Sequence, residues 1–170
     1  MFFLAIVQHT PAWVWGLLAA LVALGLWQTR ALEMSLTRVT VLPLVLTALS
    51  LAGVLGAFGH RPVALVAWAA GVAAAVGLAR RAVAVRGASW SASRGLLRVP
   101  GSWLPLALIV SRFALKYGAG VSLSLAPALA TDATFAGLCS LAYGSFSGLF
   151  LARALSLRSL ATRPATMQTA

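Results

Sequence analysis

The chain has 170 residues, of which 61% are hydrophobic and 9% are charged. Soluble domains carry roughly 25% charged residues, so this composition excludes a soluble globular protein and indicates an integral membrane protein. A net charge of +11 would suggest nucleic-acid binding in a soluble chain. In a membrane protein, excess arginine instead orients the helices, and we therefore predict no nucleic-acid partner.

Five segments are apolar enough to cross a membrane, which takes about 20 residues for a hydrocarbon core of about 30 Å. Four of them contain no charged residue, whereas one carries Arg112 and Lys116 in its middle. The predicted spans are residues 12–28, 39–58, 63–79, 103–125 and 133–152. We expect an all-α, five-helix transmembrane bundle, with one membrane domain over residues 1–155 and a disordered polar cytoplasmic tail over 156–170.

The basic residues predict how these helices are oriented. Arg61 alone lies on one side, whereas ten of the 13 basic residues belong to connections on the other: Arg30, Arg38, Arg80, Arg81, Arg86, Arg94, Arg98, Arg153, Arg158 and Arg163. Basic residues are retained on the cytoplasmic side. The expected location is a bacterial inner (plasma) membrane, with the N-terminus outside and the C-terminus in the cytoplasm.

The longest connection, residues 80–102, is the only place for structure outside the bilayer. Turn-forming residues lie between two short apolar runs there, which is typical of a β-hairpin on the cytoplasmic surface. An Arg-rich stretch lying against anionic headgroups is the alternative.

Arg112 and Lys116 are the most informative residues for function. If the helix begins at Trp103, they lie about 14 Å and 20 Å along it, on one face, near mid-membrane. A basic residue there costs roughly 2.5–3.5 kcal/mol, and the only acids, Glu33 and Asp132, belong to loops on opposite sides. Three interpretations stay open: capping of carbonyls on neighbouring helices, an anionic ligand or permeant, and a lipid headgroup.

Nearby hydroxyl groups complete a candidate binding site. Tyrosines at this depth usually need a hydrogen-bond partner, and serines one turn away could share a network with them. The candidate ligand-binding residues are Arg112, Lys116, Tyr117, Tyr143 and Ser147. Ordinary helix packing with one satisfied bond is the alternative for the hydroxyls.

Small residues at four-residue spacing predict where helices approach closely, because apolar side chains gain little from leaving lipid for protein. The positions are Gly53, Gly71, Gly118, Ser140, Gly144 and Gly148. They support a compact bundle or a homo-oligomer and do not identify a function.

Groups for catalysis or metal binding are scarce. The two acids, two histidines and one cysteine supply neither paired carboxylates nor a third metal ligand. Cys139 lies in an apolar run and is expected to be a small buried hydrophobic residue. We predict no catalytic residue, no metal and no cofactor, and an enzyme is the disfavoured interpretation.

Several motifs resemble an uncharacterised family of small polytopic bacterial inner-membrane proteins. They are HTPAWVW at residues 9–15, VPGSWLPL at 99–106, KY at 116–117 and YGSFSG at 143–148. This resemblance implies the same membrane topology and assigns no site residue. A more distant resemblance, in Arg30 and Arg38 ahead of Leu42-Pro43-Leu44, is to membrane proteins linked with cytochrome c maturation, although this chain has no CxxC motif.

Two functional hypotheses follow. The first is a small transporter-like or anion/lipid-binding membrane protein with a buried Arg/Lys centre, whose partners would be the bilayer and an anionic lipid or small anionic solute. The alternative is a non-catalytic structural or assembly subunit, in a homo-oligomer or with a membrane partner protein.

Overall fold

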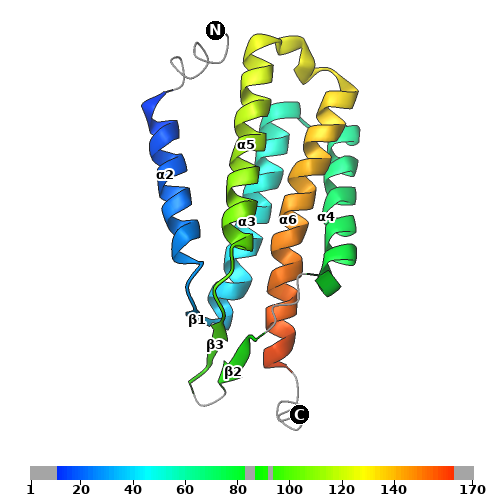
Figure 1. The fold of residues 1–170 in the computed structure, drawn as a ribbon. Helices are drawn as coiled ribbons and strands as arrows, with labels where there is room; N and C mark the ends of the chain where they lie inside the picture. Colours follow the sequence, from blue (N-terminus) through cyan, green and yellow to red (C-terminus); the bar gives the residue numbers. More distant parts are fainter. Residues whose placement is uncertain (1–10, 83–86, 92–93, 163–170) are drawn as a thin grey trace.

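The computed structural model describes residues 11–82, 87–91 and 94–162. In chain order the elements are α2 (Ala12–Trp27), β1 (Leu32–Ser35), α3 (Leu36–Phe58), α4 (Pro62–Ala82), β2 (Ser89–Ser91), β3 (Leu96–Val99), α5 (Leu104–Leu125), the 3-10 helix η1 (Pro127–Ala130) and α6 (Ala133–Ala161). The long helices lie side by side, and the strands gather at one end of them (Figure 1). We call this the sheet end, and the end with the α3–α4 turn and η1 the loop end.

Four described helices, α3, α4, α5 and α6, are long and apolar enough to cross a membrane. The protein is therefore mostly helical, as predicted, with the properties of a multi-pass membrane protein. The remaining predicted span, residues 12–28, forms the shorter helix α2 of 16 residues, about 24 Å long against a hydrocarbon core of about 30 Å. The predicted count of five spans is therefore not confirmed.

Helix α6 is longer than its predicted span. It contains 29 residues and ends at Ala161, so the first residues of the predicted disordered tail are helical, while residues 163–170 lie outside the described part of the chain. The physical reason is packing: Leu157 is buried against Val39, Leu97 and Val99 at the sheet end, which extends the ordered helix beyond the apolar run.

A hairpin is present in the 80–102 connection, because β2 and β3 pair antiparallel. The second strand lies where it was expected, whereas the first, Ser89–Ser91, lies among the residues 87–95 that were expected to form the turn. The apolar run 82–85 that was expected to form the first strand begins with the last residue of α4, and residues 83–86 lie outside the described residues. A third strand that we did not predict, β1, pairs antiparallel with the other edge of β3, giving the order β1-β3-β2. Leu97 and Val99 are buried while Arg98 between them is exposed. The sheet therefore packs one face against the start of α3 and the end of α6.

Local hydrogen bonds fix the ends of the helices. Ser35 Oγ accepts from the Arg38 N–H at the start of α3, and Asp132 accepts from the Phe135 N–H at 2.6 Å at the start of α6. These are N-cap interactions. At the loop end, Arg61 donates to the Thr131 carbonyl at 2.6 Å, which joins the α3–α4 turn to the segment before α6.

Helices α4 and α6 make the closest approach in the bundle. A Cβ added at Gly71 would collide with the Leu141 carbonyl, and one added at Gly144 would collide with the Trp68 carbonyl. At Gly148 the added atom would lie 2.6 Å from the Val72 carbonyl oxygen. We call this contact the α4–α6 seam. The main buried cluster of the bundle lies beside it and joins α3, α4, α5 and α6 through Val54, Phe58, Ala64, Ala119, Ala136 and Cys139.

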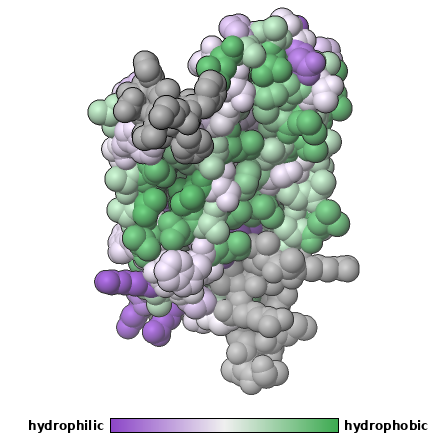
Figure 2. Space-filling view, turned by 45° about the horizontal axis from the view of Figure 1, so that its top comes forward, coloured by the Kyte–Doolittle hydropathy of each residue, from purple (hydrophilic) through white to green (hydrophobic). Residues whose placement is uncertain are grey.

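The surface matches this arrangement. Figure 2 shows hydrophobic residues over the middle of the visible face and strongly hydrophilic ones at its lower edge, near the sheet end. Large apolar side chains such as Leu49, Val66 and Leu78 are more than half exposed, which suits contact with lipid rather than with water.

Candidate functional site

Arg112 lies within α5, about 12 Å from its first residue and about 20 Å from its last at 1.5 Å per residue. Its Nη2 donates a hydrogen bond of 3.2 Å to the Leu46 carbonyl oxygen of α3. Its Nη1 is buried and has no hydrogen-bond partner among the described residues. The guanidinium therefore bridges two helices and keeps one donor nitrogen unsatisfied.

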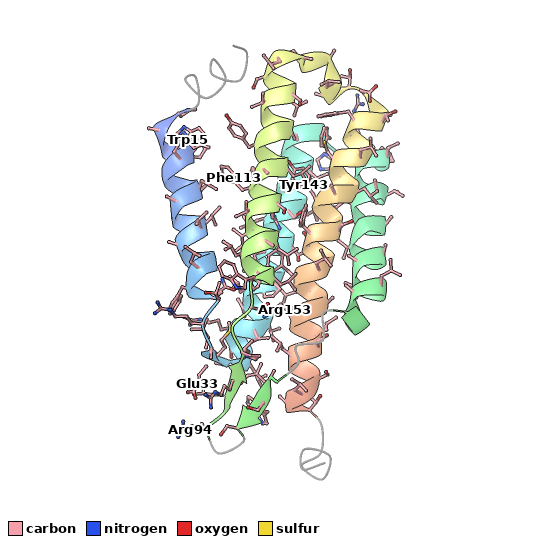
Figure 3. The ribbon with its side chains drawn as sticks, in the orientation of Figure 1. Trp15, Glu33, Arg94, Phe113, Tyr143 and Arg153 are labelled. Atoms are coloured by element: carbon pink, nitrogen blue, oxygen red, sulfur yellow. The ribbon has the colours of Figure 1, made fainter. Side chains whose placement is uncertain are left out.

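Arg112 lines a pocket of about 150 Å³, which we call the Arg112 pocket. Lys116 of α5, Ser50 of α3 and Tyr143 of α6 also line it, together with Leu49, Gly53, Ala57, Phe58, Ala119, Gly120 and Leu123. Tyr143 lies on the side of α6 that faces α3 and α5 (Figure 3). Three helices thus bring two cationic groups, two hydroxyl groups and an apolar lining together.

The two carboxylates of the chain lie elsewhere. Glu33 is on β1, and its Oε1 lies 3.8 Å from Arg94 Nη1 in an exposed ion pair. Asp132 caps α6 at the loop end. Since the sequence contains no other acidic side chain, the cations of the Arg112 pocket have no side-chain carboxylate to meet. Among the described residues, no group of three His, Cys, Asp or Glu could hold a metal ion.

Ser50 connects three helices beside the pocket. The Trp68 indole N–H of α4 donates to Ser50 Oγ at 3.3 Å, and Ser50 Oγ donates to the Tyr143 carbonyl of α6 at 3.3 Å. Ser147 Oγ donates to the same carbonyl at 3.0 Å. The hydroxyl network therefore supports the backbone of α6 at the residue whose side chain lines the pocket.

Neither Ser50 nor Trp68 belongs to the predicted binding set. A tryptophan in the middle of a span is the feature that could have indicated them, because tryptophans usually lie at membrane boundaries and a buried indole N–H needs an acceptor.

The structure brings only part of the predicted binding set together. Arg112, Lys116 and Tyr143 line the Arg112 pocket, whereas the ring of Tyr117 lies beside those of Trp15 and Phe113, with centroid distances of 6.4 Å and 6.2 Å. Ser147 is fully buried and bonds within α6. Tyr117 is separated from the Arg112 pocket because, one residue after Lys116, it faces α2 instead.

A second pocket of about 540 Å³ lies between α2 and α5, and we call it the α2–α5 pocket. Tyr117 and Phe113 line it, as do Pro11, Trp13, Val14, Leu17, Val121, Ser124 and Leu125. Lys116 and Gly120 line both pockets. The exposed Lys116 side chain therefore lies between the α2–α5 pocket and the Arg112 pocket.

The predicted packing positions also divide into two groups. Gly71, Gly144 and Gly148 lie in the α4–α6 seam, and Ser140 is fully buried with a hydroxyl that has no hydrogen-bond partner in the described part of the chain. A Cβ added at Gly53 or Gly118 would meet nothing within 4 Å. Neither glycine therefore marks a close helix contact among the described residues: Gly53 lines the Arg112 pocket, and Gly118 is exposed.

Comparisons with known proteins place the chain in one family. No curated protein and no solved structure is significantly similar to it. One family profile matches residues 1–168, almost the whole chain. This match confirms the expected resemblance to an uncharacterised family, and the comparisons carry no evidence on cytochrome c maturation. The chain therefore belongs to the family described as "Family of unknown function (DUF6622)".

Proposed function

We propose that the protein binds a small anion, or the anionic group of a lipid, at the Arg112 pocket, and that this binding serves a transporter-like role in the membrane. The observation that carries the proposal is the unsatisfied Arg112 Nη1 in a pocket without a carboxylate. A buried charge without a full set of partners is costly. An anion would supply both the opposite charge and the missing acceptor.

The composition of the pocket supports a small oxyanion. An arginine fork and a lysine provide several charged donors for a carboxylate or phosphate group, and Tyr143 adds a hydroxyl on the facing helix. A volume of about 150 Å³ is the size that admits a molecule such as benzene, so acetate, nitrate or phosphate would fit.

The α2–α5 pocket supports the transporter-like part of the proposal. Its lining includes Leu125 at the loop end of α5 and continues along that helix to Lys116. Because Lys116 and Gly120 also line the Arg112 pocket, the two pockets together offer an anion a path from the loop end to the middle of the bundle.

Thermal unfolding in a neutral detergent tests the binding step. Acetate, nitrate, sulfate and phosphate are compared at constant ionic strength, because an anion present at 100 times its Kd should stabilise the protein by about 2.7 kcal/mol. Arg112→Gln should abolish this stabilisation and Lys116→Gln should weaken it. Arg158→Gln, which removes an exposed arginine at the sheet end, is the matched control and should leave it intact.

Two outcomes would overturn the proposal. One is an anion effect that persists in Arg112→Gln. The other is a wild-type protein that no anion stabilises, together with an Arg112→Gln variant that unfolds more easily. That result would show that the Arg112 bond to the Leu46 carbonyl serves only to hold α5 against α3.

We also propose that the sheet end faces the cytoplasm of a bacterial inner membrane. The support is the distribution of charge: Arg30, Arg38, Arg94, Arg98 and Arg158 belong to the sheet end, and Arg61 belongs to the loop end. A reporter that is active only in the cytoplasm should therefore be active when it is fused after Ala170. Activity of an exclusively extracytoplasmic reporter there would reverse the orientation.

The second candidate function is a structural or assembly subunit. The observation that favours it is the exposed glycine Gly56 on α3, where an added Cβ would meet nothing within 4 Å and which does not line the Arg112 pocket, since exposed small residues admit a neighbouring helix in membranes. Mass measurement in mild detergent distinguishes the two functions, because an assembly subunit should purify with a stoichiometric partner or as an oligomer that Gly56→Leu disrupts.

A further inference from the structure

A separate pocket of about 160 Å³ lies at the sheet end, and we call it the sheet-end pocket. Three arginines from different parts of the chain line it: Arg30 from the turn after α2, Arg38 from α3 and Arg153 from α6. Arg153 lies between α6 and the sheet-end half of α5 (Figure 3). The fold therefore gathers three guanidinium groups that are far apart in sequence.

No acidic side chain lines this cluster. Neither Glu33 nor Asp132 lines the pocket, and these are the only acidic side chains in the sequence. Arg153 is half-buried, and its side chain forms no hydrogen bond or ion pair with the residues that the structure describes. Three cations that share one pocket repel each other, so an anionic partner would stabilise them.

The distance along α6 sets the level of the arginines relative to a membrane. Arg153 is about 30 Å along α6 from Ala133, which equals the thickness of a hydrocarbon core. Arg38 belongs to the first turn of α3, and Arg30 follows the end of α2. If Ala133, the first residue of α6, lies at one surface of the membrane, the three arginines lie near the opposite surface, among the lipid headgroups.

The rest of the pocket is apolar and extends from this level toward the middle of the bundle. Leu24 of α2, Leu42 and Leu46 of α3, Ile109 of α5 and Phe150 of α6 line it. Leu46 lies about 15 Å along α3 from its first residue. A ligand that fits would therefore have an anionic group at one end and a hydrocarbon chain at the other.

We propose that the sheet-end pocket is a specific binding site for an anionic phospholipid. The three arginines would hold the phosphate by charge-assisted hydrogen bonds, and the first part of an acyl chain would lie against the leucines, with the rest in the bilayer. Basic pockets between transmembrane helices bind anionic headgroups in this way. This site is distinct from the Arg112 pocket, since neither Arg112 nor Lys116 lines it.

The test measures lipid binding to the full-length protein in a neutral detergent. Dioleoyl phosphatidylglycerol, dioleoyl phosphatidylcholine and glycerol 3-phosphate are titrated separately, and bound lipid is counted by native mass spectrometry beside thermal unfolding. We expect phosphatidylglycerol to bind and stabilise, and the other two compounds to do so at least about tenfold more weakly, because one lacks net charge and the other lacks a chain.

Variants locate the site. Arg38→Gln with Arg153→Gln should weaken phosphatidylglycerol binding about tenfold, whereas Arg158→Gln, an exposed arginine five residues further along α6, should not. The loss of phosphatidylglycerol binding caused by Arg38→Gln with Arg153→Gln should be just as large in an Arg112→Gln background, which separates this site from the proposed anion site. If the double variant does not fold, the single variant Arg38→Gln is tested instead, because this side chain is exposed and its substitution should not prevent folding.

Three results would overturn the proposal. Phosphatidylglycerol binding that survives loss of Arg38 and Arg153 would do so. Binding that falls equally in Arg158→Gln would show only a general attraction of the basic surface. Equal binding of glycerol 3-phosphate and phosphatidylglycerol would identify a site for a free phosphate ester rather than for a lipid.

Discussion

The α4–α6 seam and the side of α5 that faces α3 are built from similar residues but pack in opposite ways. In the seam, three glycines bring the two backbones so close that an added Cβ would collide with carbonyl groups. On the side of α5 that faces α3, Gly120 has open space, and a pocket with Arg112 separates the two helices. Small residues at four-residue spacing thus produce a close contact only where both helices present them to each other.

This difference suggests that the α4–α6 seam serves stability and the Arg112 pocket serves function. Close packing supplies most of the association energy between helices in lipid, so the seam and its neighbouring cluster should carry the stability of the protein. A charged, incompletely satisfied group such as Arg112 reduces stability and is better explained by ligand binding. Substitutions in the two regions should therefore have unequal effects.

The largest effect is expected in the seam. Gly144→Val should lower the free energy of unfolding by about 3 kcal/mol, because the new side chain would collide with the Trp68 carbonyl and force α4 and α6 apart. Unfolding by sodium dodecyl sulfate in mixed micelles measures this change. Gly77→Val on α4, where an added Cβ meets nothing within 4 Å, is the control. Equal effects of the two substitutions would show that the seam is not specially sensitive.

An intermediate effect is expected where the two regions meet. Ser50→Ala should cost about 1 kcal/mol, because it leaves the Trp68 N–H without its acceptor and removes one donor from the Tyr143 carbonyl. A double-mutant cycle with Trp68→Phe should show that the two losses are not additive. Strict additivity would mean that the Trp68–Ser50 hydrogen bond contributes nothing to stability.

The smallest effect is expected on α5. Gly118→Ala should raise the free energy of unfolding by about 0.5 kcal/mol, because alanine favours the helix and the site has room for a methyl group. The same detergent titration measures it. A loss of more than about 1 kcal/mol would show instead that another helix covers this face, which would favour the assembly function.

Hydropathy was sufficient to predict the four long helices, because a stretch of about 20 apolar residues has few alternatives to a membrane helix. It also predicted α2 to within one residue, although this helix, which ends at Trp27 where the chain turns toward β1, is shorter than the other four. Strand β1 has four residues, and its pairing with β3 joins segments too distant in sequence for any local pattern to reveal.

The candidate site was predicted only in part. The depth of Arg112 and Lys116 followed from their place in an apolar run, and the structure places both at one pocket with Tyr143. The side on which Tyr117 lies depends on where α2 packs, and the acceptor of Arg112 is the Leu46 backbone carbonyl, which no side-chain pattern specifies. Interhelical rotation is thus the information that a single sequence lacked.

The three-stranded sheet has a consequence for how the protein is made. Translation produces β1 before α3 and α4 and produces β3 after them, so the first strand can pair only when both of these helices have left the ribosome. The buried side chains of the sheet pack against Leu157, near the end of α6, which is synthesised later still. The cluster that joins α3, the sheet and α6 can therefore form only after the ribosome has released residues up to Leu157.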